Sequence, residues 1–347
     1  MSLIDCDGYD YLQAGMTGAQ ILAALQAQAY YSRFGFNTNS LSVGTGAFGI
    51  GLCLIPAGGV GGNDVDIYKA LPATVGDGYV FGQRIKLTAT GPAAVLYLLS
   101  TADGTTDLAV SFTALGGISA TIGTQTFNTP LAIWKVGVWF YMEIVFGTVG
   151  GTPTFTIKVN GDVIITAQPS RGPGPIDTVR WGGNGWQLDD YYVLATDDTG
   201  LVDPLGNIRV GTVNPGANGD VIGMTPTGAD TNWQAAINPL LSSTIYNSTD
   251  TVGVYDLYDL AASVPARDVF AIKVSGGYAQ DNSVQLYAKN KIKTGGTEYD
   301  GAQHGVASQV LSIQSDIWEK NPNTGENWTY TELNTDLQIG GALAASD

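Results

Sequence analysis

Three β-type segments follow one another between Val138 and Leu194, and this stretch constrains the fold more than any other part of the chain. Val138–Phe146 is a dense run of aromatic and β-branched residues, which suits a pleated and largely buried surface. Apolar and polar residues alternate over 155–160, so one face of that strand is apolar and the other is wet. Asn160–Gly161 then supplies the two positive-φ residues of a tight hairpin turn. The stretch predicts the closing strands of an antiparallel sandwich.

Short β-type runs bounded by Gly, Asn or Asp continue along most of the chain, including 328–333 near its end. Regular short strands with turns between them are typical of a sandwich or a barrel. One helix is expected, at Thr17–Ala29, because Ala, Leu and Gln favour helix and Thr17 can serve as its N-cap. Residues 233–240 indicate a further helical turn. We therefore predict an all-β chain with one short helix near the N-terminus.

A turn-rich segment, Asp197–Pro215, marks the expected domain boundary. The chain has 347 residues, which is enough for two domains of ordinary size. A short strand is expected at Asn207–Val213 within this segment, and it could belong to either side. We place the cut near residue 200, so that residues 1–200 form the larger sandwich and residues 201–347 form a second, smaller β-sandwich.

The charge balance restricts the partners. The chain carries 31 Asp and Glu residues against 15 Lys and Arg residues, a formal net charge of −16, and it has no basic patch. Nucleic acid and anionic membrane surfaces are therefore expected to be repelled. No apolar run is long enough to span a membrane, and the first residues lack the pattern of a signal peptide. Cys6 and Cys53 are interpreted as small apolar side chains rather than as a disulfide.

Residue types that serve catalysis are sparse. The single histidine, His304, lies in an expected loop, and one histidine rules out multi-histidine metal sites and weakens any Ser-His-Asp arrangement. Glycan hydrolysis needs two carboxylates that face each other across a cleft. The first half of the chain has one glutamate, Glu143, without the E-x-D-x-x-E pattern of glucan-cleaving sandwich enzymes. We therefore expect a protein that is not an enzyme.

The turn Trp181–Trp186, which reads WGGNGW, is the first candidate binding site. Glycan sites use aromatic faces with polar neighbours, since sugar C–H faces stack on rings while hydroxyls need polar partners. The candidate glycan-binding residues are therefore Trp181, Asn184 and Trp186. The alternative that the sequence leaves open is one tryptophan in the core and one in the turn.

Asp189 and Asp190 are the second candidate site, in the expected strand WQLDDYYV. Two neighbours in a strand point to opposite faces. One interpretation is structural, with one carboxylate accepting hydrogen bonds from backbone N–H groups and the other facing solvent. The other interpretation is a calcium site, although the spacing is not that of any fixed calcium loop. No other cofactor is expected.

The order of several short motifs resembles that in structural proteins of tailed bacteriophages. The opening IDCDGYDYL resembles their I-D-G-F-D-x-Y start, with Cys6 where Gly is more usual. Trp139–Leu194 is similar to the concanavalin A-like (laminin-G-type) jelly roll of those proteins. The linker PLGNIRVGTVNP and the ending NPNTGENWTYTELNTDLQIG resemble their following strand and their terminus. The resemblance covers nearly the whole chain and carries over no catalytic residue.

The resemblance implies a virion component with a lectin-like fold, found in a tail fibre, a tail tip, or a capsid or collar decoration. Its implied partners are other virion proteins, copies of itself in an oligomer, and glycans of the host surface to which a phage attaches. Its implied location is the virion, after assembly in the host cytoplasm. Two alternatives stay open, a virion-associated glycan depolymerase on the same fold and a stand-alone glycan-binding lectin.

Overall fold

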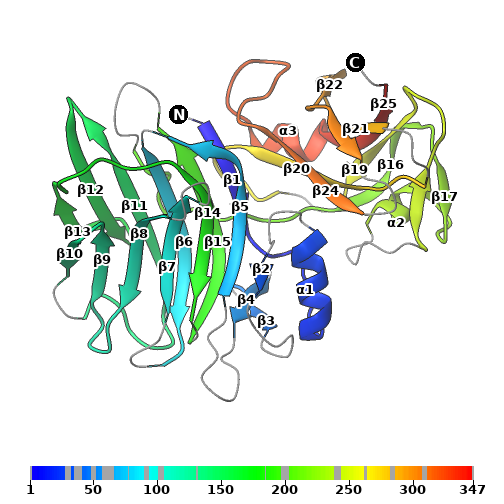
Figure 1. Ribbon diagram of the computed structural model, residues 1–347. Coiled ribbons are helices and arrows are strands. Elements are labelled where there is room, and N and C mark those ends of the chain that lie inside the picture. Colours follow the sequence, from blue (N-terminus) through cyan, green and yellow to red (C-terminus); the bar gives the residue numbers. More distant parts are fainter. Residues whose placement is uncertain are drawn as a thin grey trace. The chain divides into compact units, whose positions relative to one another are not determined.

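The computed structural model is built mainly of antiparallel strands (Figure 1). It describes residues 2–27, 33–34, 41–47, 52–56, 66–76, 78–89, 94–100, 105–129, 132–183, 185–196, 203–237, 244–261, 264–281, 286–306 and 311–345. Two compact units divide the chain, with the first ending at Thr212 and the second running from Val213. Within the described ranges, no helix is long and apolar enough to cross a membrane. The all-β prediction is confirmed.

The first unit is a jelly-roll sandwich of two antiparallel sheets. Sheet A has the strand order β13-β12-β11-β6-β15-β4-β3, with β1 paired to β15. Its strands are β1 (Ser2–Asp7), β3 (Leu41–Thr45), β4 (Leu52–Pro56), β6 (Tyr79–Leu87), β11 (Trp139–Val149), β12 (Thr152–Val159), β13 (Asp162–Ala167) and β15 (Trp186–Ala195). Sheet B has the order β10-β9-β8-β7-β14-β5-β2. Its strands are β2 (Arg33–Phe34), β5 (Asp66–Val75), β7 (Val95–Ser100), β8 (Thr105–Phe112), β9 (Ile118–Ile122), β10 (Gln125–Asn128) and β14 (Ile176–Gly182).

The predicted hairpin turn is confirmed between β12 and β13. Asn160 has φ +52° and Gly161 has φ +92°, and the flanking residues Val159 and Asp162 are paired across the turn. The side chain of Asn160 also accepts a hydrogen bond, at 2.8 Å, from the backbone N–H of Tyr141. The turn residue therefore sets the hairpin and ties it to the neighbouring strand β11.

The core of the first unit lies between the two sheets. Apolar side chains from both sheets join one buried cluster, for example Phe81 and Phe146 from sheet A with Leu98 and Val110 from sheet B. Close packing of such large side chains contributes most of the stability of a sandwich. Cys53 is buried and Cys6 is half-buried, and no disulfide joins them within the described residues.

Helix α1 (Gly18–Ala27) forms where the sequence predicted a helix, and Ile21 and Leu25 bury its apolar face in the same core. Thr17 caps it as expected. Its hydroxyl oxygen accepts a hydrogen bond from the N–H of Gln20 at 3.3 Å, and the side chain of Gln20 accepts one from the N–H of Thr17 at 2.9 Å. This reciprocal capping box satisfies two N–H groups that a helix start otherwise leaves unpaired.

The second unit is built on a six-stranded sheet, sheet C, with the order β16-β19-β25-β21-β22 and with β23 paired to β21. Its strands are β16 (Pro215–Ile222), β19 (Tyr255–Leu260), β21 (Leu286–Thr294), β22 (Thr297–Asp300), β23 (His304–Val306) and β25 (Gln338–Ala344). Two ribbons accompany it, β17 (Thr225–Thr227) with β18 (Tyr246–Ser248), and β20 (Ile272–Tyr278) with β24 (Ser312–Trp318). Val274 of β20 and Ile292 of β21 share one apolar cluster, which packs the second ribbon on sheet C.

The described residues of the second unit also include two short helices, α2 (Asn232–Ala236) and α3 (Tyr330–Thr335). Helix α2 falls within the helical turn expected over 233–240, of which 238–240 lie outside the described residues. The prediction of a strand over 328–333 is wrong, because helix α3 begins within this range. Thr329 and Glu332 form a second capping box, and Leu333 buries against the core of this unit. The strand expected at Asn207–Val213 is also wrong, because no strand forms there.

Candidate functional site

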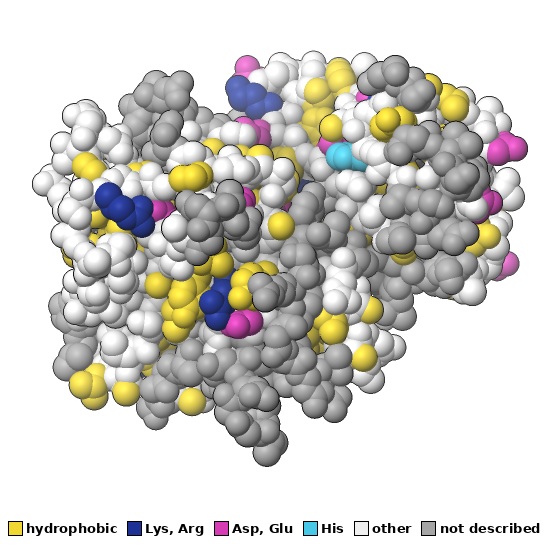
Figure 2. All heavy atoms as spheres, viewed as in Figure 1, with side chains coloured by type: hydrophobic (Ala, Val, Ile, Leu, Met, Phe, Trp, Pro, Cys, Tyr) yellow, Lys and Arg dark blue, Asp and Glu magenta, His cyan; other side chains and the backbone are white. Residues whose placement is uncertain are grey.

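A row of three side chains crosses the neighbouring strands β7, β14 and β5 of sheet B on its outer face. Arg180 of β14 is paired with Tyr68 of β5 on one side and with Tyr97 of β7 on the other. Strand alternation places the neighbours Val179 and Trp181 in the core, so the three side chains of the row point away from it. Figure 2 shows a basic and an acidic side chain together among hydrophobic ones, tyrosine included, over the region of β5, β14 and β7.

The row is held by cation–π contacts. The guanidinium carbon of Arg180 lies 5.4 Å from the ring centroid of Tyr68 and 4.5 Å from that of Tyr97. Contacts of this length are worth about 0.5–1 kcal/mol each at an exposed site. The guanidinium therefore lies between two aromatic rings, and the three groups form one aromatic and polar surface, here called the Tyr68–Arg180–Tyr97 row.

Asp66, at the start of β5, fixes the guanidinium from the side. Oδ1 accepts hydrogen bonds from Nε of Arg180 at 3.1 Å and from Nη2 at 2.9 Å, and Oδ2 accepts one from Nη2 at 2.9 Å. The side chains of Arg180 and Asp66 are 28% and 24% exposed. This pairing orients the arginine and leaves both charged groups accessible to a ligand.

Gly182 makes room for this arrangement. It is paired with Asp66 in the sheet, and a Cβ at this position would lie 2.9 Å from Oδ1 of Asp66 and 3.2 Å from Cε2 of Tyr97. Both distances are shorter than ordinary van der Waals contact. The absence of a side chain at Gly182 therefore allows the carboxylate and the ring to take their positions beside Arg180.

The two tryptophans that the sequence proposed for glycan stacking lie in the core instead. Trp181 and Trp186 are each 1% exposed. Nε1 of Trp181 donates to Oε1 of Gln83 at 2.6 Å, and its ring meets Tyr191 edge to face with centroids 5.5 Å apart. Neither indole offers a face to a ligand, so the predicted stacking platform is wrong for them. Asn184, the third member of that prediction, lies outside the described residues.

Asp189 and Asp190 lie at a β-bulge in β15, where the register with β6 shifts and Asp190 has φ +39°. The carboxylate of Asp189 accepts hydrogen bonds from the N–H groups of Ala47 and Asp190, both at 2.9 Å. The carboxylate of Asp190 accepts from Nε of Arg84 at 2.9 Å and from the N–H of Val210 at 2.8 Å. Both carboxylates therefore have the structural role of the first interpretation. The expectation that one of them faces solvent is wrong, since Asp189 and Asp190 are 4% and 1% exposed.

Burial raises the pKa of Asp189 to about 7, and the charge of Asp190 adds to this effect. Burial also raises the pKa of Asp190, against the hydrogen bonds from Val210 and Arg84, which lower it. Within the described ranges, no group of three or more His, Cys, Asp or Glu side chains could hold a metal ion. Calcium binding at this pair stays a prediction. The groups that the structure places against the two carboxylates are hydrogen-bond donors, namely N–H groups.

Residues 203–212, here called the 203–212 segment, lie against the outer face of sheet A. Oε1 of Glu143 accepts hydrogen bonds from the N–H of Gly206 and from the hydroxyl of Tyr192, both at 2.7 Å. Arg84 donates to the side chain of Asn207 and, at 2.8 Å, to the carbonyl oxygen of Ile208. Glu143 of β11, Arg84 of β6 and Asp190 of β15 therefore bind the backbone of this segment.

His304 lies on β23 rather than in the expected loop. Its Nε2 is 3.0 Å from Oδ2 of Asp316, and the same oxygen accepts a hydrogen bond from Nδ2 of Asn290 at 2.7 Å. Oδ1 of Asp316 accepts from the N–H of Ala302 at 2.9 Å. The pair thus connects three strands of the second unit, and within the described residues its hydrogen bonds go to Asn290 and Ala302 rather than to a serine or cysteine that it could activate.

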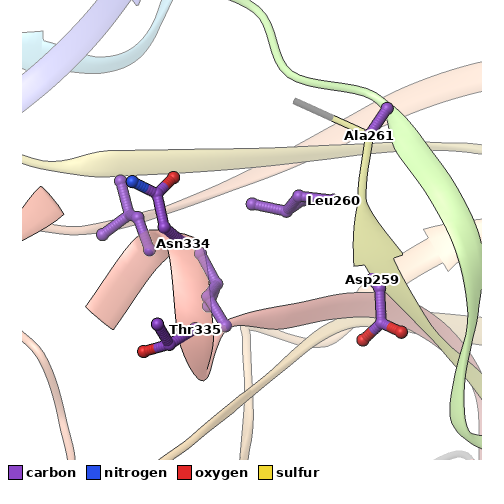
Figure 3. Close-up of a pocket in the computed structure, with 7 residues that line it drawn as sticks. Asp259, Leu260, Ala261, Asn334 and Thr335 are labelled. Carbon is purple, nitrogen blue, oxygen red and sulfur yellow. The ribbon is translucent and has the colours of Figure 1, made fainter. Parts of the chain in front are cut away.

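The second unit also has a cavity of about 350 Å³ between the end of β19 and helix α3 (Figure 3). Its lining is Asp259, Leu260, Ala261, Leu333, Asn334, Thr335 and Leu337. The side chain of Asn334 is used by the backbone of Val264, donating to its carbonyl oxygen at 2.8 Å. Gln338 donates to Oδ1 of Asp259 at 2.9 Å. The polar groups of this cavity serve the fold, and the cavity brings no reactive constellation together.

No protein-family model matches the sequence, and no curated protein matches it. Among solved structures the chain is similar to a sialidase, with 8% identity over 46% of this chain and 17% of that chain and a TM-score of 0.31. It is similar to the carbohydrate recognition domain of Emp47p, with 7% identity over 39% and 79% and a TM-score of 0.31. It is also similar to the galectin LEC-6 of Caenorhabditis elegans, with 12% identity over 35% and 90% and a TM-score of 0.28.

These solved structures include carbohydrate-recognition and galectin-like folds, and the likeness is to part of this chain. The chain spans 17% of the length of the sialidase. No residue role is carried over from any of them. The predicted phage origin finds no support in these comparisons and stays a prediction.

Proposed function

We propose that the first unit is a non-enzymatic recognition domain that binds glycans on the outer face of sheet B. The observation that carries the proposal is the Tyr68–Arg180–Tyr97 row with Asp66 beside it. Sugar rings present C–H faces that pack on aromatic side chains, and their hydroxyls need donors and acceptors at fixed positions. The row supplies the rings, Arg180 supplies N–H donors, and Asp66 supplies carboxylate acceptors.

A rigid strand scaffold supports this role. Tyr68, Tyr97 and Arg180 project from three neighbouring strands of one sheet, so their spacing is set by the hydrogen-bonded ladder. Sites on strands hold their geometry better than sites on loops. Ligand binding at such a site therefore costs less free energy for ordering the side chains of the protein. The bidentate pairing with Asp66 removes most of the rotational freedom of Arg180 before any ligand arrives.

Four carboxylates of the first unit, those of Glu143, Asp189, Asp190 and Asp66, favour recognition over hydrolysis. A glycosidase needs one carboxylic acid and one carboxylate facing each other across the scissile bond. Glu143 is 2% exposed and is bound to Tyr192 and Gly206, while Asp189 and Asp190 are bound to backbone and arginine N–H groups. Asp66 is held by Arg180. We therefore propose binding without catalysis, because each of these four carboxylates is already held by partners within the fold.

A glycan array with matched variants tests the proposal. Tyr97→Ala removes one ring of the row and is expected to reduce binding at least about tenfold, because aromatic contacts contribute strongly to such sites. Tyr255→Ala in the second unit is the matched control, since Tyr255 also makes a cation–π contact, with Lys291 at 4.6 Å, and bonds a carboxylate, that of Glu298. Equal binding by wild type and Tyr97→Ala, both folded by thermal melting, would reject the site.

The biological setting of such binding is a separate proposal. The motif order at both ends of the chain supports a virion protein that meets host-surface glycans, in contact with other virion proteins and with copies of itself. Mass spectrometry of purified phage particles tests this setting. Absence of the chain from particles would remove the virion role and leave a stand-alone lectin as the setting of the same site.

A further inference from the structure

We infer that the site on sheet B selects neutral saccharides and discriminates against anionic ones. The inference rests on the proposed glycan function and specifies its ligand class. It comes from the electrostatics of a single pair, Arg180 with Asp66, whose three hydrogen bonds of 2.9–3.1 Å place the opposite charges in direct contact.

The charge of Arg180 is compensated before a ligand binds. An unpaired arginine on a sheet face would attract carboxylate or sulfate groups, and it would do so bidentately. Here Asp66 occupies one bidentate edge of the guanidinium, the one formed by Nε and Nη2. A ligand carboxylate at the same arginine would lie close to the carboxylate of Asp66, and like charges at such distances cost free energy even in a half-exposed site. The site therefore offers an anionic group no net attraction.

The hydrogen-bonding groups left at the pair suit hydroxyls. A guanidinium has five N–H donors. The bonds to Asp66 use Nε and Nη2, whereas Nη1 makes no hydrogen bond within the described residues. Oδ1 of Asp66 accepts two of the three bonds and Oδ2 accepts one. Because each carboxylate oxygen has two lone pairs, Oδ2 can still accept a hydrogen bond from a ligand. The pair thus presents donors and acceptors side by side. A sugar hydroxyl can both donate and accept, whereas a sulfate or carboxylate can only accept.

The charge of the whole chain acts in the same direction. A formal net charge of −16 gives the chain as a whole a negative average potential, which disfavours the approach of anionic ligands. A neutral saccharide has no net charge, so this potential does not change its affinity. Its affinity for the site should therefore be nearly independent of salt, unlike the affinity of a ligand held by ion pairs.

The test compares paired glycans that differ only in charge, on an array and then by calorimetry: neutral oligosaccharides and their sulfated or sialylated counterparts. Wild type is expected to bind the neutral member at least about fivefold more tightly, and its Kd is expected to change less than about twofold between about 20 mM and about 500 mM salt. Asp66→Asn keeps the size of the side chain and frees the charge of Arg180. It is expected to shift the ratio toward the anionic member by about fivefold to tenfold.

Asp300→Asn is the matched control, because it makes the same change in net charge at a half-exposed ion pair of the second unit, with Lys289 and Lys291. It is expected to leave the neutral-to-anionic ratio unchanged. Tighter binding of the anionic members by wild type, lost in Arg180→Ala, would overturn the inference while leaving the glycan function in place. Retention of no glycan of either kind by wild type would overturn the proposed function and this inference with it.

Discussion

Nε of Arg84 lies 2.9 Å from Oδ2 of Asp190, and both side chains are buried beneath the 203–212 segment. The pair is part of a network in which Glu143 and Tyr192 also bind the backbone of that segment. Residues beyond the last strand of the sandwich therefore complete its outer face. Because the buried charges are matched to these particular backbone groups, the segment is an integral part of the first unit.

Loss of the arginine should be costly. Arg84→Met leaves the carboxylate of Asp190 buried without its ion-pair partner, and removing one partner of a buried pair costs about 3–5 kcal/mol. Urea unfolding of the full chain measures this. Lys289→Met, at a half-exposed pair with Asp300, is the control and should cost less than about 1 kcal/mol. Equal effects of the two substitutions would show that the network around Arg84 does not support the fold.

The end of the first unit can be tested with two fragments. A fragment that ends at Thr212 keeps the 203–212 segment, whereas one that ends at residue 202 leaves Glu143, Arg84 and Asp190 without their backbone partners. We expect the shorter fragment to melt at a clearly lower temperature, because each buried polar group left unpaired costs about 1–3 kcal/mol. Identical melting curves from differential scanning calorimetry would place the boundary earlier than we do.

The raised pKa of Asp189 makes the stability of the first unit depend on pH. A carboxyl whose folded pKa is about 7, above its unfolded value of 3.8, binds more protons in the folded state between these values. The free energy of unfolding should therefore fall as pH rises through this window. Asp189→Asn removes this titration, so we expect denaturant curves at pH about 5 and about 8 to differ less for the variant than for wild type. A pH dependence identical in the two proteins contradicts the assignment.

Gly182 provides a test of the binding surface that removes no polar group. Gly182→Ala places a Cβ 2.9 Å from Asp66 Oδ1 and 3.2 Å from Tyr97, so the row must shift. We expect glycan affinity to fall about fivefold to tenfold, since a displaced ring and carboxylate lose their fit to the ligand. Gly76→Ala, whose Cβ would meet nothing within 4 Å, is the control. A normal affinity in Gly182→Ala would mean that the arrangement beside Arg180 is not the site.

Alternation along the chain was enough to predict much of the fold. The β-branched and aromatic run after Val138 and the Asn160–Gly161 turn form strands and a hairpin as expected, because both signals are local. Thr17 caps helix α1 through Gln20, three residues on. The same spacing in Thr329 and Glu332 also signals a helix, but the aromatic residues around it favoured a strand, and capping with burial of Leu333 prevailed.

The tryptophan pattern did not predict the candidate site, although alternation along each strand gives the direction of its side chains. In β14, Val179 and Trp181 share the core face, so Arg180 between them must point outward. The same period in β5 places Tyr68 outward between the buried Ile67 and Lys69. That the outward residues of three strands lie in one row depends on a strand order in which β5, β14 and β7 are neighbours. That order is a property of the tertiary fold, and no local pattern contains it.

The Asp189–Asp190 pair shows a second limit of sequence patterns. Leu188 and Tyr191 both enter the core although they are three residues apart, which strict alternation forbids. The β-bulge at Asp190 inserts the extra residue that makes this possible. A bulge depends on the facing strand, here β6 with Arg84, so the sequence of β15 alone could not reveal where either carboxylate would point.

The most direct test of the central claim is calorimetric titration of the full chain and of Arg180→Ala with the neutral oligosaccharide that binds best on the array. Arg180 joins the two rings of the row and anchors Asp66, and its partly exposed side chain is not required by the core. We predict saturable binding by wild type and at least about a tenfold loss in the folded variant, as expected when a charged hydrogen-bond donor is removed. An affinity unchanged by Arg180→Ala would contradict glycan recognition on this face of sheet B.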